Sequence, residues 1–454
     1  MHKDIEESAQ RTGRYFDRIG QRIENEWLKE KFDPAALPAI AERTLRDDPA
    51  HLAVKAPDIA NWYISHPDLP QQYNDNSRFG QPPVTMFAHR RFYIEVLHWF
   101  DATTAIHQHG FDGAFAVLSG SSIHSTYHFA ETDRTSERLL FGDVTHQNSE
   151  LLHPGSVRPI HSGNGFIHAL FHLERPSLSI VIRTPQTRSA GIQYSYEPPY
   201  IALDPFDEDR WTARALDYLG VARAMKRSDA AALVQEAFER ADDLGCQKFL
   251  LALHRAAEHE SVLNRDKKAP DTVAATMAAA ATIAVKKKLG ILAAPILLAA
   301  QESLRSEELL QLRNKIHDPE HRYFLALLMN VPRRERVLEL VKEMYPEHDP
   351  HEKIHTWLAA LTDEKSHLSG YALGEDALTL ADSMIRNQPL AEVVRSLEKK
   401  HDVQLELDDV EEVKASLAHL ATINILRPLL VDVPNPSMGE LLARASASRI
   451  ATAR

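Results

Sequence analysis

The chain contains a single cysteine, Cys246, and no long run of basic residues. One cysteine excludes a disulfide framework and is typical of proteins in a reducing cytoplasm. The formal net charge of −12 does not favour binding to nucleic acid or to an anionic membrane. The charged N-terminal stretch MHKDIEESAQRTGRYF has no apolar segment of the signal-peptide type. We therefore expect a cytoplasmic protein that binds neither nucleic acid nor membrane.

Hydrophobic runs of membrane-spanning length are also missing. The most apolar stretch, residues 272–301, is interrupted by three consecutive lysines (Lys286 to Lys288) and by Pro295. Neither half reaches the roughly 18 residues of a membrane helix, so two buried helices are predicted. A glycine-rich phosphate loop and a nucleophile elbow are absent as well.

The 454 residues predict two or three domains. Apolar residues at helical spacing predict an N-terminal helical segment, which a connection dotted with proline and asparagine extends to residue 83. Short stretches rich in β-branched and aromatic residues predict a barrel over residues 84–200. The proline- and acid-rich segment YSYEPPYIALDPFDED then marks a linker, after which Ala/Leu-rich helices fill residues 207–454. The predicted class is α+β: a central barrel, N-terminal helices and a large all-α C-terminal domain.

Residues 101–120, DATTAIHQHGFDGAFAVLSG, contain the arrangement that is hardest to explain without chemistry. His107 and His109 lie two residues apart on a predicted strand, so their side chains share one face. An apolar β-rich stretch precedes them, and a turn at Gly120 and a second strand, SSIHSTYHF, follow. This layout is typical of a metal-bearing corner in a small β-barrel. The alternative is a pair of strand histidines that face solvent.

A second stretch, GSVRPIHSGNGFIHALFH at residues 155–172, supplies three more candidate metal ligands: His161, His168 and His172. The strand-like run LSIVIRT follows it. Histidines of this group that do not bind a metal are expected to hydrogen-bond to a ligand or to be satisfied buried rings.

Together the two stretches resemble the motifs of the cupin superfamily, G-x5-H-x-H-x3,4-E-x6-G and G-x5-P-x-G-x2-H-x3-N. In the first motif His107, His109 and Gly120 match, Asp101 replaces the first glycine, and the glutamate ligand is missing because Gly113 or Ala114 stands there. In the second motif Gly155 and Gly163 match, while His161 replaces the proline. Two extra residues precede His168, and His172 occupies the asparagine position. The resemblance implies a jelly-roll barrel with a metal on His107, His109 and His168.

A three-His cupin without the glutamate is similar to the thiol-dioxygenase branch, which includes cysteine dioxygenase. EVLHWFDATTAIHQHG is similar to that branch's strand, tryptophan, small loop and I-H-x-H. LSIVIRTP is similar to its closing S-x-H-x-Y-x-P strand, with Ser179 and Pro185 in place. Val181 and Arg183 replace the histidine and the tyrosine, which argues against cysteine as the substrate. The resemblance covers residues 90–186 and implies Fe(II), O₂ and a homodimer.

Neutral imidazoles also suit Zn, Ni or Mn, so the metal stays open. Arg183 shares strand parity with Ser179, and both are candidate catalytic residues on the closing strand. Arg183 is expected either to clamp an acidic substrate group or to form a salt bridge at the barrel rim. Arg90, Tyr127 and His172 are candidate substrate-binding residues, although the strand that carries Tyr127, His124 and His128 can present either face.

The helical region carries two further histidine pairs at i,i+4 spacing, His317 with His321 and His351 with His355. Such a pair holds zinc only when a third ligand arrives. No H-E-x-x-H pattern and no nearby cysteine supports one, so surface histidines are predicted.

The favoured function is therefore a non-haem Fe(II) oxygenase that binds O₂ and a small amino-acid-like or thiol substrate. A non-catalytic cupin that senses a ligand or acts as a scaffold, and signals through its helices, is the second hypothesis. A metal-assisted isomerase or lyase is the third.

Overall fold

The structure, a computed structural model, describes residues 2–66, 68–73, 80–100, 105–185, 191–207, 209–263, 273–362, 373–431 and 435–452. Contacts divide the chain into two compact units. The first comprises Met1–Thr126, His146–Gly191 and Leu309–Asp432, and the second comprises Tyr127–Thr145, Ile192–Glu308 and Val433–Arg454. Asp101 lies outside the described residues.

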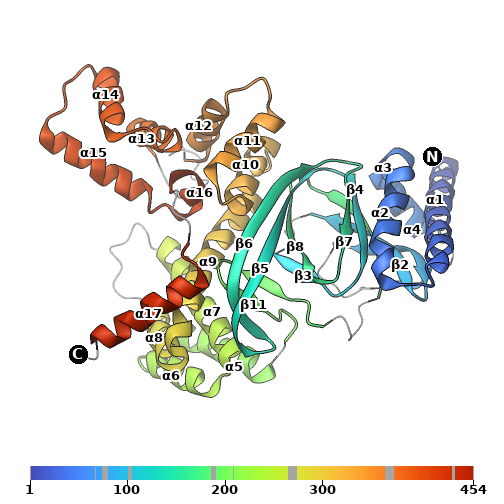
Figure 1. The fold of residues 1–454 in the computed structure, drawn as a ribbon, viewed down its shortest axis with the longest axis horizontal. Helices are drawn as coiled ribbons and strands as arrows, with labels where there is room; N and C mark the ends of the chain where they lie inside the picture. The colour runs from blue at the N-terminus through green and yellow to red at the C-terminus, as the bar shows by residue number, and fades with distance from the viewer. Residues whose placement is uncertain are drawn as a thin grey trace. The chain divides into compact units, whose positions relative to one another are not determined.

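The first unit begins with four α-helices that cover one side of the strands, with a short 3₁₀ helix between the first two (Figure 1). Along the first helix, Tyr15, Ile19, Ile23 and Trp27 are buried, as their spacing predicts. They share a core with the apolar strand residues of FYIEVLHW and SLSIVIR. The helices are α1 (His2–Lys29), η1 (Pro34–Ala36), α2 (Leu37–Asp47), α3 (Ala50–Ala53) and α4 (Ala56–Ser65).

Two groups of strands form the β structure. One is a five-stranded sheet in the order β1-β2-β9-β4-β7, and the other is a closed barrel in the order β10-β11-β6-β5-β8-β3. The strands are β1 (Pro83–His89), β2 (Phe92–Trp99), β3 (His107–His109), β4 (Gly113–Ser119), β5 (Ser122–Ser136), β6 (Leu139–Leu152), β7 (Val157–Ile160), β8 (Gly163–His172), β9 (Ser177–Arg183), β10 (Ser195–Glu197) and β11 (Ile201–Leu203).

The remaining helices of the first unit build a second core, to which Ile123 of β5, Phe171 of β8 and Leu173 just after β8 contribute. Asp318 and Asp349 cap α10 and α12 by accepting hydrogen bonds from backbone N–H groups, as expected of Asp-Pro helix starts. The helices are α10 (Pro319–Asn330), α11 (Arg334–Met344), α12 (Pro350–Leu361), α13 (Glu375–Ile385), α14 (Leu390–His401), α15 (Leu407–Leu420), η4 (Asn424–Leu426) and α16 (Arg427–Leu430).

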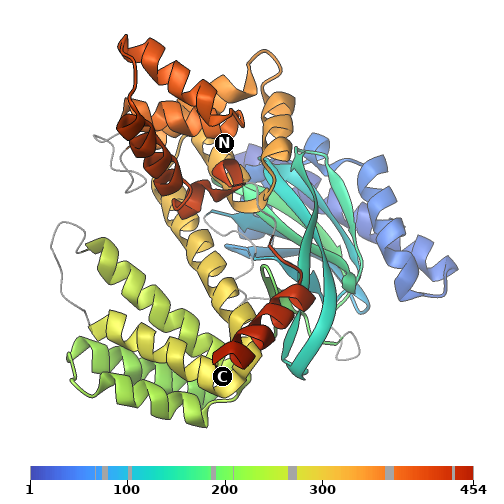
Figure 2. The same cartoon turned by 60° about the vertical axis from the view of Figure 1, so that its left-hand side comes forward.

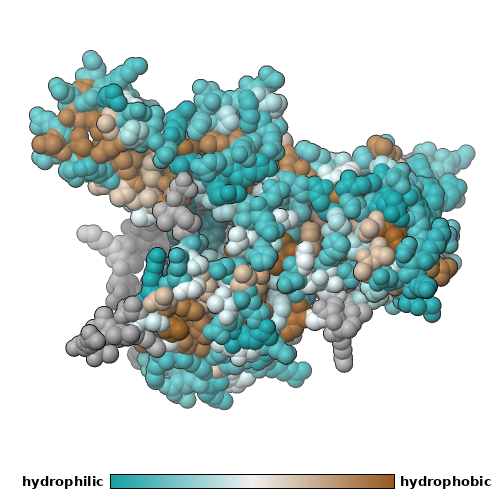
Figure 3. All heavy atoms as spheres, viewed as in Figure 1, coloured by the Kyte–Doolittle hydropathy of each residue, from teal (hydrophilic) through white to brown (hydrophobic). Residues whose placement is uncertain are grey.

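The second unit contains a stacked helical bundle (Figure 2). Asp209 caps its first helix. Its helices are α5 (Arg210–Ala224), α6 (Ala230–Arg240), α7 (Asp243–Leu263), α8 (Val273–Leu289), η3 (Gly290–Leu292), most of α9 (Ala293–Lys315) and α17 (Met438–Thr452). The face in Figure 3 is mostly hydrophilic, with hydrophobic side chains in small separate patches.

The predicted fold class is confirmed: a closed β-barrel has helices before it and many helices after it in the chain. Some strand boundaries differ from those that the sequence predicts. A strand expected over residues 84–100 is two strands joined by a turn at Arg90, and the strands expected over 122–130 and 137–145 continue to Ser136 and Leu152. The apolar stretch after residue 272 forms α8 and α9, and no helix among the described residues is long and apolar enough to cross a membrane. The domain limits at residues 83, 200 and 207 stay a prediction.

Candidate metal centre

Three histidines from two paired strands converge inside the first unit. Strand β3 pairs antiparallel with β8, and this register sets His107 directly opposite His168. His109 lies two residues along β3 on the same face. One ring nitrogen from each histidine lies within 4.8 Å of the others, and all three side chains are buried. In the part of the chain that the structure describes, this is the one group of three or more metal-binding side chains so close together.

Burial keeps these rings neutral. Desolvation lowers the pKa of His107, and it lowers the pKa of His109 and His168 well below the ordinary value. The neighbouring imidazoles lower the pKa of His109 and His168 further, and so does Arg183 for His109. Each ring therefore carries a nitrogen lone pair at neutral pH, which is the form that binds a metal ion.

The hydrogen bonds around the rings fit a metal ion. Nδ1 of His107 lies 2.8 Å from the carbonyl oxygen of Ala105, so Nδ1 carries the proton and Nε2 carries the lone pair. Nε2 of His109 lies 2.9 Å from Nε2 of His168. Nδ1 of His109 is buried without a hydrogen-bond partner in the structure. Two imidazole nitrogens that point at each other across so short a distance can both coordinate one cation, and three imidazole donors suit a transition metal.

Aromatic rings line the cluster. Phe111 lies 4.6 Å from the ring of His109, and Phe166 lies 4.5 Å from the ring of His168, both between centroids. Phe115 contacts His168 at 5.9 Å. This apolar surround lowers the local dielectric and strengthens electrostatic interactions at the site.

Arg183 lies at the edge of this aromatic surround. Its guanidinium stacks over the Phe111 ring at 3.6 Å and forms an ion pair with the buried Glu95 at 3.2 Å. Its Nε atom is buried and makes no hydrogen bond in the structure. Of the two expectations for Arg183, the structure shows a salt bridge. The guanidinium also lowers the pKa of His109. The clamp on an acidic substrate group stays a prediction.

His124 connects the cluster to a carboxylate. Nε2 of His124 lies 3.1 Å from Nδ1 of His168, and Nδ1 of His124 lies 2.9 Å from Oε1 of Glu150. Glu150 also forms an ion pair with Arg158. Burial alone would raise the pKa of Glu150, but the bonds from His124 and Arg158 outweigh it and lower the pKa to about 2. The carboxylate is therefore ionised at neutral pH.

His172 forms a separate buried group. Its ring stacks on Trp99 with centroids 4.7 Å apart, and its Nδ1 lies within hydrogen-bonding distance of the hydroxyl groups of Ser122 and Ser177. Burial and the charges of Arg313 and Arg322 lower its pKa to about 3. Ser179 accepts a hydrogen bond from the indole N–H of Trp99. The structure places neither residue in the three-His cluster.

Three other candidates also lie apart from the cluster. Arg90 is exposed on the β1–β2 turn, and His161 is exposed before β8. Tyr127 is buried on β5, where strand alternation turns it to the face opposite His124. Sequence reasoning left His124 unassigned and missed Glu150. The signal for His124 was its position on the strand after the Gly120 turn, whereas Glu150 lies in the part of β6 that the pattern did not predict.

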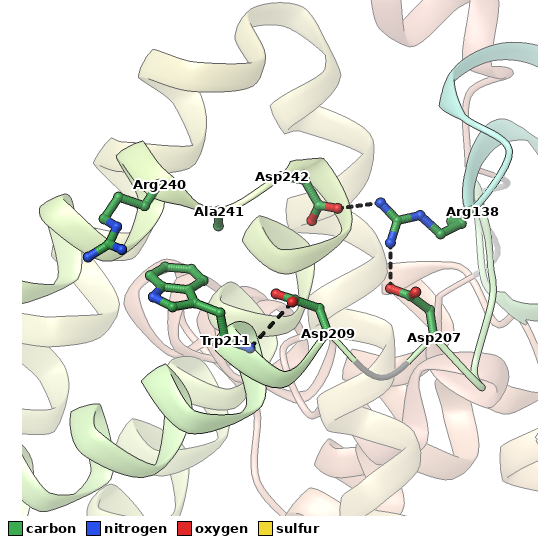
Figure 4. A pocket seen from close by; sticks show the side chains of 7 residues that line it. All are labelled: Arg138, Asp207, Asp209, Trp211, Arg240, Ala241 and Asp242. Atoms are coloured by element: carbon green, nitrogen blue, oxygen red, sulfur yellow. Dashed lines mark hydrogen bonds and ion pairs between the residues drawn. The ribbon is translucent and has the colours of Figure 1, made fainter.

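A surface hollow of about 540 Å³ lies in the second unit (Figure 4). Arg138 forms ion pairs with Asp207 and Asp242 on its wall, and Asp209 caps α5. These charges satisfy one another, so the hollow offers no free set of metal ligands or catalytic groups among the residues that line it.

Comparisons with known proteins add little. No protein-family model matches the chain, and no curated protein matches it in sequence. Among solved structures, TT1209 from Thermus thermophilus is 16% identical, with 26% of this chain and all of that one covered, at a TM-score of 0.17. A chain from the structures of the DMSP lyases RdDddP and RnDddQII is 18% identical, with 33% and 73% covered, at a TM-score of 0.18.

A protein with a double-stranded β-helix domain from Klebsiella pneumoniae subsp. pneumoniae MGH 78578 is 17% identical, with 30% and 98% covered, at a TM-score of 0.15. The strand topology gives the fold class, and the three-His cluster gives the candidate function.

Proposed function

We propose that the protein is a metal-dependent cupin enzyme, and specifically a non-haem Fe(II) oxygenase that acts on a small acidic substrate. The observation that carries the proposal is the convergence of three buried, neutral imidazoles in a cluster that, within the described residues, includes no carboxylate. Three neutral ligands leave the full charge on a divalent ion, and they leave coordination positions for a substrate and O₂.

His107, His109 and His168 would hold the ion, which when bound would supply the activation of dioxygen. His107 presents Nε2 because the Ala105 carbonyl oxygen keeps its proton on Nδ1. His109 and His168 present their Nε2 atoms toward each other. Phe111, Phe115 and Phe166 would exclude water from the reacting groups.

Arg183 would orient the substrate. Its buried Nε–H is available as a donor, while the Glu95 carboxylate and the Phe111 ring hold the guanidinium in place. Guanidinium groups bind carboxylates through paired N–H donors, so an amino acid or a thiol acid is the substrate class that fits. Arg183 would thus act in binding and orientation, beside the imidazoles that hold the ion.

The test is oxygen consumption by anaerobically prepared, Fe(II)-loaded protein with a panel of small amino acids, thiol acids and their esters. The proposal expects uptake with some of the free acids, loss of uptake in His107→Ala, and a KM raised about tenfold or more in Arg183→Lys. Zinc in the purified protein, with turnover that consumes no O₂, would instead favour the isomerase or lyase. No metal after reconstitution would favour the ligand-sensing or scaffold protein.

A further inference from the structure

A continuous hydrogen-bonded chain leads away from the three-His cluster. It runs from Nδ1 of His168 to Nε2 of His124 at 3.1 Å, and from Nδ1 of His124 to Oε1 of Glu150 at 2.9 Å. Nε of Arg158 then donates to Oε1 of Glu150 at 2.8 Å. The ring of His124 is 1% exposed, whereas the Glu150 and Arg158 side chains are 28% and 29% exposed. The chain therefore begins in the buried site and ends near solvent.

The Glu150 carboxylate determines which atom donates in each of these hydrogen bonds. An ionised Glu150 can only accept, so Nδ1 of His124 must be its donor. In a neutral ring, Nε2 of His124 is then an acceptor, and Nδ1 of His168 must donate to it. This places the proton of His168 on Nδ1 and leaves the lone pair on Nε2, the atom that faces His109.

We propose that His124 and Glu150 are positioning residues that fix the His168 ring in the tautomer and orientation needed to bind a metal through Nε2. The proposal rests on the proposed function only in taking the three-His cluster to be the metal centre. When a metal-binding histidine donates a hydrogen bond from its other ring N–H, the acceptor fixes the tautomer of the ring and raises the basicity of the nitrogen that binds the metal. His124 links the Glu150 carboxylate to His168, because it hydrogen-bonds to both.

The three cluster histidines differ in how they are held. His107 is fixed by a backbone carbonyl oxygen, and His168 is fixed by the His124–Glu150 pair. His109 has no partner at Nδ1 in the structure, so its Nε2 is the donor in the bond to His168 when no metal is bound. When a metal binds, His109 is the ring that must move its proton to Nδ1. The His124 chain matters because it keeps His168 out of that exchange.

The first experiment needs no metal. Histidine-labelled, metal-free protein is studied by solid-state ¹⁵N NMR, and the signals of His124 and His168 are assigned by their loss in His124→Gln and His168→Gln. The proposal expects both rings to be protonated on Nδ1 alone. A His168 ring protonated on Nε2, or a doubly protonated His124, would overturn it. This result stands even if the protein binds no metal and the proposed function fails.

The second experiment measures Zn²⁺ and Co²⁺ affinity by competition with a chelator. His124→Leu and Glu150→Leu should each weaken binding by about 10- to 100-fold, as loss of a ligand's hydrogen-bond partner typically does. His124→Gln should retain most of the affinity, because its amide oxygen can still accept from Nδ1 of His168. The double variant His124→Leu with Glu150→Leu should lose no more than His124→Leu alone, because both act through one chain.

Glu26→Gln is the matched control. Glu26 on helix α1 accepts from Arg22 on the same helix and from Arg43 on helix α2, so it is also a partly buried carboxylate held by arginine. Among the described residues it is not hydrogen-bonded to a histidine. Its affinity for Zn²⁺ should equal that of the wild type. Equal losses in His124→Gln and His124→Leu, or strictly additive losses in the double variant, would overturn the proposal. Pulsed EPR of the Cu²⁺-loaded protein that counts four coordinated imidazoles would also overturn it, because His124 would then be a ligand.

Discussion

The histidine pairs of the barrel and of the helices differ in what lies opposite them. His107 and His109 share a strand face, and His351 and His355 are spaced to share a face of α12. The strand pair is buried and meets His168 on the neighbouring strand. The helix pair is half-buried, and no third metal-binding side chain joins it among the described residues. A pair at the right spacing therefore becomes a candidate site only when a facing element supplies the third ligand.

The other helical pair fails for a simpler reason. His317 precedes the first residue of α10, Pro319, whereas His321 lies in the first turn. The two residues are therefore not one turn apart on a single helix. Asp318 between them caps the helix by accepting from the backbone N–H groups of Glu320 and His321. The i,i+4 spacing here reflects a helix start.

The largest expected difference between the two regions is in metal affinity. His109→Ala should weaken Zn²⁺ binding by more than about 100-fold, because loss of a ligand costs more than loss of a ligand's hydrogen-bond partner. His355→Ala should leave the affinity unchanged. Chelator competition on the two variants measures both. Equal Zn²⁺ affinities in His109→Ala and His355→Ala would contradict the claim that only the barrel pair binds the metal.

Ion pairs should also differ between the strands and the helices. Arg183→Met leaves the Glu95 carboxylate, 1% exposed, without its guanidinium, and should lower the free energy of unfolding by about 3 kcal/mol. Lys400→Met removes a more exposed pair with Asp376 and should cost less than about 1 kcal/mol. Urea denaturation of both variants measures these free energies. A larger loss in Lys400→Met would contradict the contrast.

Acid should distinguish the buried histidines of the barrel from those of the helices. Burial and two arginines hold the folded-state pKa of His172 at about 3, against about 6.5 for an unfolded chain. Below pH 6.5 the unfolded state binds a proton that the folded state does not, so stability falls as the pH falls. His172→Asn should reduce the loss between pH 7 and pH 5 by about 2 kcal/mol.

The half-buried His351 provides the control, since His351→Asn should change the same loss much less. Urea denaturation at the two pH values measures both. If His172→Asn lost as much stability between pH 7 and pH 5 as the wild type, the folded protein would not hold the His172 ring neutral.

Glu197 in the second unit should respond to pH in the opposite sense. Burial raises its pKa to about 7 despite the hydrogen bond from Gln247 and the charge of Arg255. The folded state therefore binds the extra proton, and stability is lost as the pH rises from about 4.5 through 7. Glu197→Gln should raise the free energy of unfolding by about 1.5 kcal/mol at pH 8 and by almost nothing at pH 4. The value at pH 8 is reduced because the side chain is partly exposed to solvent. A gain of equal size at both pH values would contradict this account.

The sequence predicted the parts that depend on local periodicity. Strand alternation alone placed His107 and His109 on one face, and Asp-Pro signals predicted the starts of α10 and α12. The convergence of His168 with this pair depends on the pairing of β3 with β8 across about 60 residues of chain, for which the motif spacing was a guide. The cluster's geometry agrees with that expectation, while its role as a metal site remains a proposal.

The parts that local patterns could not supply depend on contacts between distant strands. Glu150 reaches His124 because β6 continues to Leu152, and the polar run before it gave no strand signal. Arg183 reaches Glu95 because β9 pairs with β2, in a register that sets Arg183 opposite Tyr93 and leaves Glu95 diagonal to it. A carboxylate partner of this kind is decided by the sheet order, which a single sequence does not encode locally.

The most direct test of the central claim is the metal content of anaerobically purified protein, measured by elemental analysis for the wild type, His107→Ala and His351→Ala. The three-His cluster predicts about one transition-metal ion per chain in the wild type and in His351→Ala, and almost none in His107→Ala. Metal retained in His107→Ala, or absent from the reconstituted wild type, would contradict the claim that these barrel histidines form a metal centre.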